Sequence, residues 1–129
     1  MRERFNWPEK SIVLETVDRG AGPGNILLIG EESEFVSEVA VGFGESGVSA
    51  ENVARKAVEQ MRHYLVSRAA VGEYLTDQLL LPCALAEGGH FTAASISKHT
   101  RTHAEIIARF LGRPFTFHTL PEAGFEVVY

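Results

Sequence analysis

One histidine lies where it could act as a nucleophile. His99 belongs to the segment Ser-Ile-Ser-Lys-His-Thr-Arg-Thr (residues 95–102), just ahead of Thr-His-Ala-Glu (residues 102–105), which matches the capping box at the start of a helix. A helix N-terminus carries partial positive charge and unpaired N–H groups that attract phosphate. With Lys98 and Arg101 nearby, this positive end should favour a neutral imidazole that can attack phosphorus. The pattern predicts a nucleophile, although these residues also fit an ordinary surface or capping histidine.

Two other groups resemble functional sites less closely. Residues 20–24, Gly-Ala-Gly-Pro-Gly, lack the lysine and the following helix of a phosphate-binding loop, so they are predicted to form a turn. Cys83, His90, His99 and His103 do not have the spacing of zinc ligands, and no metal ligand is assigned. Cys83 lies in an apolar run and is predicted to be a buried, reduced thiol.

The hydrophobic pattern predicts the elements that position these side chains. Strands are expected at residues 11–17, 25–30, 35–43, 91–97, 115–120 and 125–129. Helices are expected at 52–69 with Ser49 as the N-cap, at 72–81 ending near Pro82, and from the capping box to the Gly-Arg-Pro at 112–114. This order favours an α+β fold, a two-layer sandwich in which helices pack on one face of a mixed β-sheet.

Composition narrows the function classes. The chain has 129 residues, of which 45% are hydrophobic, so residues 1–129 are expected to form a single domain. The net charge of -5 argues against a basic protein that coats nucleic acid, so any RNA contact should be local. No apolar run is long enough to span a membrane, and residues 1–8 lack the apolar core of a signal peptide. A cytoplasmic location is therefore expected.

Longer segments resemble a known family. Residues 42–51 and 70–82 closely resemble the C-terminal part of RNA 3′-terminal phosphate cyclases, and the most specific string is Glu-Tyr-Leu-x-Asp-Gln-Leu-x-Leu-Pro at 73–82. Shorter matches fall at residues 22–25, 88–92 and 99–102, and the resemblance runs from about Val13 onward. The resemblance implies that the fold is a fragment of the repeated αβ architecture of these enzymes.

The resemblance also implies an activity and a site. The histidine matching His99 attacks the α-phosphate of ATP and becomes a covalent histidine–AMP. AMP then passes to an RNA 3′-phosphate, and the ribose 2′-OH closes a 2′,3′-cyclic phosphate. A divalent cation, Mg²⁺ or Mn²⁺, would offset the triphosphate charge. Asp77 would either hold a ribose hydroxyl or orient the imidazole. The residues implied to border the ATP site are Tyr74, Leu75, Thr76, Asp77 and Gln78.

Two departures from the family pattern set further expectations. His103 stands where family members commonly carry asparagine, so a contact near the nucleophile should be altered. Family enzymes are more than twice as long, and their N-terminal portion supplies phosphate-gripping arginines and glutamines and an acidic metal ligand. This chain alone should therefore be a poor enzyme.

The expected partners are RNA 3′-phosphate ends, a separate chain carrying that portion, and a second copy bound through exposed sheet edges. The alternative is a non-catalytic cyclase-like protein that binds RNA or assists ribosome assembly. The resemblance implies that this branch lacks the nucleophilic histidine, which His99 supplies here.

Overall fold

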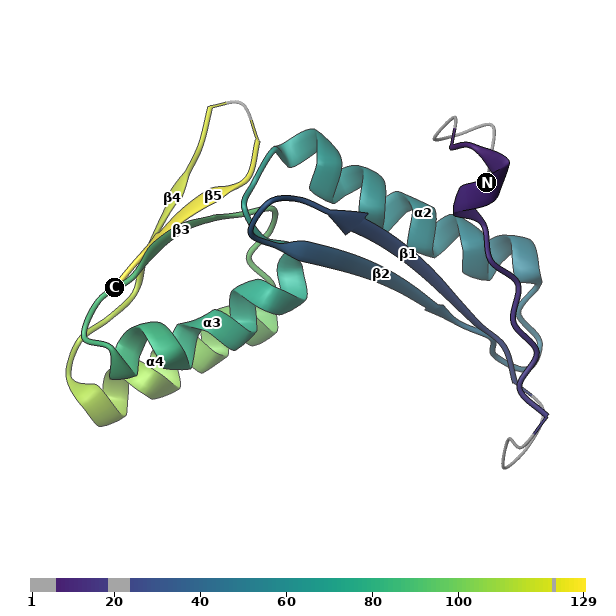
Figure 1. Ribbon diagram of the computed structural model, residues 1–129. Coiled ribbons are helices and arrows are strands. Elements are labelled where there is room, and N and C mark those ends of the chain that lie inside the picture. Colours follow the sequence, from purple (N-terminus) through teal and green to yellow (C-terminus); the bar gives the residue numbers. More distant parts are fainter. Residues whose placement is uncertain (1–6, 19–23, 122) are drawn as a thin grey trace. The chain divides into compact units, whose positions relative to one another are not determined.

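The computed structural model describes residues 7–18, 24–121 and 123–129. Its elements, in chain order, are η1 (Glu9–Ser11), β1 (Ile26–Glu32), β2 (Ser37–Phe43), α2 (Ala50–Ser67), α3 (Glu73–Leu85), β3 (His90–Ala93), α4 (Lys98–Leu111), β4 (Thr116–Thr119) and β5 (Phe125–Val128) (Figure 1). The predicted turn at 20–24 lies outside the described residues except for Gly24.

Internal contacts divide the chain into two compact units. Unit 1 comprises Met1–Gly30 and Val39–Met61, and unit 2 comprises Glu31–Glu38 and Arg62–Tyr129. None of the helices in the described part of the chain is long and apolar enough to cross a membrane. The expectation that residues 1–129 form one domain stays a prediction.

In unit 1, residues 26–30 of β1 and 39–43 of β2 pack against the first part of α2. Ser49 caps this helix as predicted, because its hydroxyl accepts a hydrogen bond from the Asn52 N–H at 3.3 Å. The helix approaches β2 closely at Gly42, where an added Cβ would lie 2.9 Å from a methyl carbon of Val53. The buried apolar side chains of this unit include Ile29, Ala40, Val53, Ala57, Val58 and Met61.

In unit 2, three antiparallel strands lie in the order β3-β5-β4. Val127 of β5 is opposite Phe91 of β3 and Phe117 of β4, which places the three side chains in one row on one face. The rows on either side of it lie on the opposite face, where His90 of one row contacts Glu126 of the other at 2.8 Å. Val71 adds a parallel bridge to Ala93 at the edge of β3.

Helices α3 and α4 cover the apolar face of this sheet. Their inward side chains join strand residues in one core, which contains Val71, Leu80, Ala84, Ala93, Ala104, Ile107, Phe115, Val127 and Tyr129. Gly112 ends α4 in the left-handed conformation with φ 75°, as a C-terminal glycine does. The α+β class is therefore confirmed, and unit 2 has the predicted arrangement of helices on one face of a sheet.

The strand predicted at residues 11–17 is wrong. Ser11 ends η1, and Ile12–Val17 has no regular secondary structure. Val13 and Leu14 are 85% and 96% exposed, so the alternating pattern there does not reflect a buried face. A strand also needs a neighbour to pair its backbone, and the described strands pair only as β1-β2 and β3-β5-β4.

Three predicted boundaries are also wrong. α3 continues through Pro82 to Leu85, because Leu80 and Ala84 are buried one turn apart and hold the last turn on the core. β3 ends at Ala93 instead of continuing to Ser97. α4 begins at Lys98, so the proposed capping box at residues 102–105 lies inside the helix.

Candidate active site

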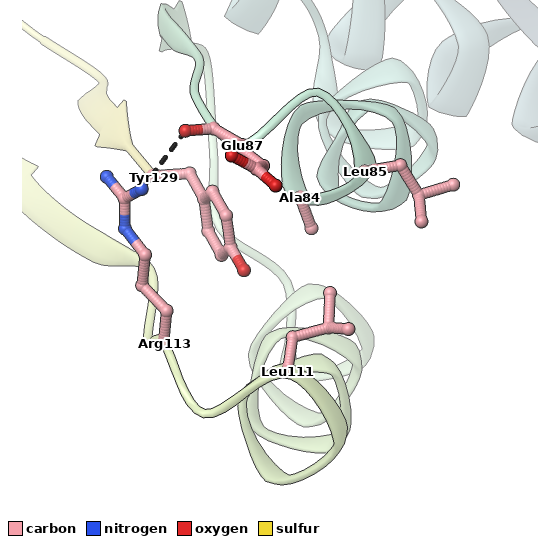
Figure 2. Close-up of a pocket in the computed structure, with 6 residues that line it drawn as sticks. All are labelled: Ala84, Leu85, Glu87, Leu111, Arg113 and Tyr129. Carbon is pink, nitrogen blue, oxygen red and sulfur yellow. Dashed lines mark hydrogen bonds between the residues drawn. The ribbon is translucent and has the colours of Figure 1, made fainter.

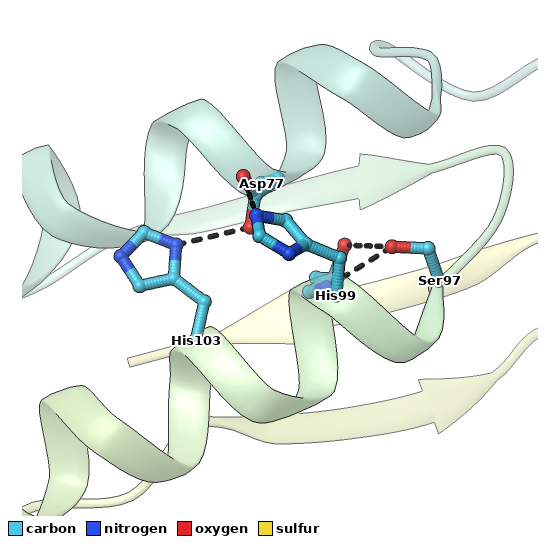
Figure 3. Close-up of polar contacts among 5 residues, drawn as sticks. Asp77, Ser97, His99 and His103 are labelled. Atoms are coloured by element: carbon cyan, nitrogen blue, oxygen red, sulfur yellow. Dashed lines mark hydrogen bonds and ion pairs between the residues drawn. The ribbon is translucent and has the colours of Figure 1, made fainter.

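A carboxylate on α3 meets two imidazoles on α4. The Asp77 Oδ2 atom lies 3.4 Å from His99 Nε2, and Oδ1 lies 3.0 Å from His103 Nδ1 (Figure 3). The two imidazole ring centroids are 6.5 Å apart. All three residues belong to unit 2.

The start of α4 explains why the two histidines share a face. Ser97 is the N-cap, and its hydroxyl accepts a hydrogen bond from the Thr100 N–H at 3.0 Å. His99 therefore lies inside the first turn instead of ahead of the helix. His103 follows four residues later, which is the spacing that places two side chains on the same face. α4 thus presents both rings to α3.

The three side chains differ in exposure. The His99 side chain is 81% exposed, whereas those of Asp77 and His103 are 22% and 30% exposed. An ionised carboxylate only accepts hydrogen bonds, so a contacting ring nitrogen must carry the proton. His103 can therefore donate from Nδ1 to Oδ1. The His99 Nε2 atom lies at ion-pair distance from Oδ2. The Asp77 carboxylate is therefore partly shielded from solvent and contacts one accessible imidazole, that of His99.

The other predicted positions on α3 divide between two faces. Tyr74 and Gln78 are exposed to solvent near Asp77 in the sequence. Leu75 is partly buried against the core of unit 2. Thr76 is fully buried, and its hydroxyl donates to the Gly72 carbonyl at 2.7 Å. The five-residue segment therefore presents its first, fourth and fifth side chains outward or toward α4, and its second and third side chains inward.

Two polar contacts that the sequence pattern did not indicate fix the beginning of α3. The Ser95 hydroxyl donates to Glu73 Oε2 at 2.8 Å, which links the starts of α3 and α4. Glu38, which is 7% exposed, accepts a hydrogen bond from the Gly72 N–H at 3.0 Å. A Cβ at Gly72 would overlap the Glu38 carboxylate. Only one sequence feature indicated the Ser95–Glu73 contact, an acidic residue in the first turn of a predicted helix. The Glu38–Gly72 contact joins residues that are far apart in the sequence, so no local pattern indicated it.

The basic residues expected near the nucleophile take different positions. Lys98 begins α4 and is exposed. The Arg101 guanidinium lies 5.6 Å from the centre of the Phe117 ring of β4. This geometry is a cation–π contact with the sheet. The positive character beside His99 thus comes from the N-terminus of the helix.

Cys83 is partly buried on α3, and burial raises the pKa of its thiol. An added Cβ at Gly89 would overlap its Sγ atom, so the thiol packs directly on the loop before β3. Among residues 7–18, 24–121 and 123–129, no group of three or more His, Cys, Asp or Glu side chains is arranged to hold a metal ion.

A separate pocket of 390 Å³ lies at the C-terminal ends of α3 and α4. Figure 2 shows its lining residues, Ala84, Leu85, Glu87, Leu111, Arg113 and Tyr129. Arg113 donates to the Glu87 carbonyl at 3.0 Å, and its guanidinium lies 4.7 Å from the centre of the Tyr129 ring. Its one basic side chain therefore already has protein partners.

The Asp77–His99 pair is the arrangement best suited to chemistry. An accessible imidazole with one nitrogen directed at a carboxylate can keep its proton on that nitrogen and present the other lone pair to an electrophile. The neighbouring helix N-terminus favours an anionic group such as phosphate. The site is therefore equipped for nucleophilic attack on phosphorus.

The chain is similar to proteins of one family. A family model described as RNA 3′-terminal phosphate cyclase matches residues 8–117. The chain is 44% identical over 109 residues to the RNA 3′-terminal phosphate cyclase of Ectopseudomonas mendocina, a match that covers 84% of this chain and 32% of that protein. It is 42% identical over 127 residues to the one from Salmonella enteritidis, covering 98% and 37%. It is 45% identical over 115 residues to the one from Koribacter versatilis, covering 89% and 32%. The chain thus spans about a third of the length of these relatives.

Proposed function

Because the chain belongs to the RNA 3′-terminal phosphate cyclase family, we propose that it is the nucleophile-bearing, C-terminal portion of an ATP-dependent enzyme. The reaction converts an RNA 3′-phosphate into a 2′,3′-cyclic phosphate. The observation that carries this proposal is the exposed His99 imidazole in the first turn of α4, 3.4 Å from the Asp77 carboxylate.

The proposed reaction has three steps. A ring nitrogen of His99 attacks the α-phosphorus of ATP, forming a P–N bond while pyrophosphate leaves. An oxygen of the RNA 3′-phosphate then attacks the phosphorus of the bound AMP, and the P–N bond breaks to give an RNA–AMP anhydride. The ribose 2′-OH finally attacks the RNA phosphorus, loses its proton and expels AMP. Covalent catalysis suits this task because the intermediate retains the transfer potential of ATP.

The residues of α3 have separate roles in this proposal. Asp77 orients the imidazole, because its carboxylate is already directed at Nε2 of His99. Tyr74 and Gln78 are exposed and border the ATP site. Leu75 and Thr76 face inward and hold α3 on the core, so they support the site through the position of the backbone.

The remaining phosphate contacts are assigned to protein outside this chain. A divalent cation would offset the charge of the triphosphate when ATP is bound. The described residues offer no cluster of ligands for it, and we assign its ligands to none of them. Stabilisation of transition-state charge is usually the largest catalytic term, so the chain alone should have little activity.

Labelling with radioactive ATP tests the proposal. The 129-residue chain would be incubated with Mg²⁺ or Mn²⁺ and ATP labelled at the α-phosphate, alone and with the portion of the Salmonella relative that lies outside the match. We expect acid-labile label on the chain in the mixture, because a P–N bond is hydrolysed in acid. His99→Ala should remove the label, since it removes the attacking nitrogen.

Two controls sharpen this test. ATP labelled at the γ-phosphate should leave no label, because pyrophosphate departs. His118→Ala changes an exposed histidine on β4 and should keep full labelling. An unlabelled wild-type chain in the mixture would refute the proposal and favour the non-catalytic role in RNA binding or ribosome assembly.

A further inference from the structure

His103 contacts the same carboxylate as His99, but its side chain is much less exposed to solvent than that of His99. Its Nδ1 atom lies 3.0 Å from Asp77 Oδ1, which is the shorter of the two carboxylate–imidazole contacts. Its side chain is 30% exposed, compared with 81% for His99. His103 is therefore placed to act on Asp77 and is too shielded to be the attacking group.

We propose that His103 is a positioning residue for His99, acting through Asp77. The His103 Nδ1–H donates to Oδ1 and fixes the carboxylate plane, so that Oδ2 stays directed at His99 Nε2 (Figure 3). The catalytic consequence of this inference rests on the proposed function of His99. The contact between His103 and Asp77, and its effect on the His99 ring, do not depend on that proposed function.

The difference in burial explains why a second residue is needed. A side chain as exposed as that of His99 has little packing to hold its ring, so the orientation of the ring depends on its ion-pair contact with Asp77. Asp77 has side-chain freedom of its own, which a hydrogen bond from the facing helix removes. Pre-organisation of this kind matters because small displacements of an attacking atom cost rate.

The chemistry of the contact supplies a matched pair of variants. In asparagine, the amide nitrogen is bonded to Cγ, as Nδ1 is in histidine, so His103→Asn keeps an N–H donor at nearly the same point. Leucine has almost the shape of asparagine but no donor. Both variants remove the ring of His103. A difference between them therefore reports the hydrogen bond to Asp77.

The first measurement is the rate of adenylylation in the mixture described above. His103→Leu should lower the rate about tenfold, the loss expected for one hydrogen bond to a charged group. The ATP concentration at half-maximal rate should not change, because no contact with ATP is removed. His103→Asn should recover most of the lost rate. In an Asp77→Asn background, His103→Leu should cause no further loss, since the two residues act through one contact.

The second measurement needs no activity. NMR of the ¹⁵N-labelled 129-residue chain should show neutral His103 with its proton on Nδ1, the less common tautomer of free histidine. The ring signals of His99 should differ between His103→Leu and His103→Asn, and should stay unchanged in His118→Leu. The NMR measurement tests the inference in the 129-residue chain itself, even if the mixture is not labelled by ATP.

The outcomes separate the two proposals. An unlabelled wild-type mixture with the expected NMR result refutes the proposed function and supports the positioning contact. Neutral His103 with its proton on Nε2 instead of Nδ1, or identical His99 signals in the Leu and Asn variants, overturns the positioning role. Labelling at the wild-type rate in His103→Leu also overturns it, and leaves the proposed function of His99 standing.

Discussion

The carboxylate of Asp77 is shared between two imidazoles, and this sharing couples residues that the chain separates by an entire strand. Asp77 lies on α3, whereas both histidines lie on α4 beyond β3. The resemblance of residues 73–82 and 99–102 to the cyclase family predicted that Asp77 and His99 belong to one site. It did not predict which oxygen meets which ring, because side-chain geometry depends on how the two helices pack.

The contact between His103 and Asp77 also could not be predicted from the sequence. The position of His103 was noted as a departure from the family pattern, with an altered contact expected near the nucleophile. Nothing in the residue type indicated that Nδ1 would face Asp77 at 3.0 Å. The i,i+4 spacing of His99 and His103 could have revealed the shared face, had the helix start been placed at Lys98.

The thiol of Cys83 gives a prediction that is independent of the site. Burial raises the pKa of this thiol, so less thiolate forms in the folded chain than in the unfolded chain at pH values near the ordinary pKa of cysteine. Alkylation by iodoacetamide should therefore reach half its maximal rate at a higher pH in the folded chain than in urea. A coincident pH dependence in the two states would contradict this prediction. The same shift means that this group's contribution to stability is lost as the pH rises through the folded pKa.

At the scale of elements, periodicity predicted the buried faces better than the ends. The spacing of Val53, Ala57, Met61, Tyr64 and Leu65 predicts one buried helix face. The first three are buried on α2, Tyr64 is partly buried, and Leu65 is 38% exposed. The end of α3 was misplaced because Pro82 usually interrupts a helix, whereas packing of Ala84 holds another turn here. Tertiary packing, which no local pattern contains, decided that boundary.

The beginning of α4 can be tested directly, because two residues compete as its N-cap. The structure assigns this role to Ser97, whose hydroxyl contacts both the N–H and the hydroxyl of Thr100. Ser97→Ala should lower the free energy of unfolding by about 1 kcal/mol, as loss of an N-cap does. Thr102→Ala should leave it unchanged or slightly higher, because Thr102 is exposed inside the helix and alanine is the better helix former.

Urea denaturation monitored by circular dichroism measures both variants. A larger loss in Thr102→Ala than in Ser97→Ala would restore the capping box at residues 102–105. It would also place His99 outside the helix.

At the scale of the whole molecule, unit 1 leaves one face of the β1–β2 hairpin open. The opposite face packs on α2, but Ile26, Leu28, Val39 and Phe43 are between 45% and 65% exposed. Large exposed apolar patches on soluble proteins usually mark surfaces that bind something.

This open face should bind the apolar dye ANS. Replacing Leu28 and Phe43 together by lysine should lower ANS fluorescence, because both side chains lie on the exposed face and neither is buried. Val66→Lys is the control, since Val66 is an apolar residue of α2 that is 73% exposed and does not belong to the hairpin. Equal dye binding by the double variant and the wild-type chain would show that the hairpin face does not attract apolar ligands.

The central position of β5 in unit 2 has a kinetic consequence. β4 and β5 are adjacent in the chain and can pair as a hairpin on the microsecond timescale. β3 pairs with β5 only across the whole length of α4, so that closure carries a loop-entropy cost and is slower. Until β3 has paired with β5, helices α3 and α4 have no complete sheet surface to pack against. The rate-limiting event in assembling unit 2 should therefore be the docking of a preformed β4–β5 ribbon onto β3, and the Asp77–His99 pair should come together only after that barrier is crossed.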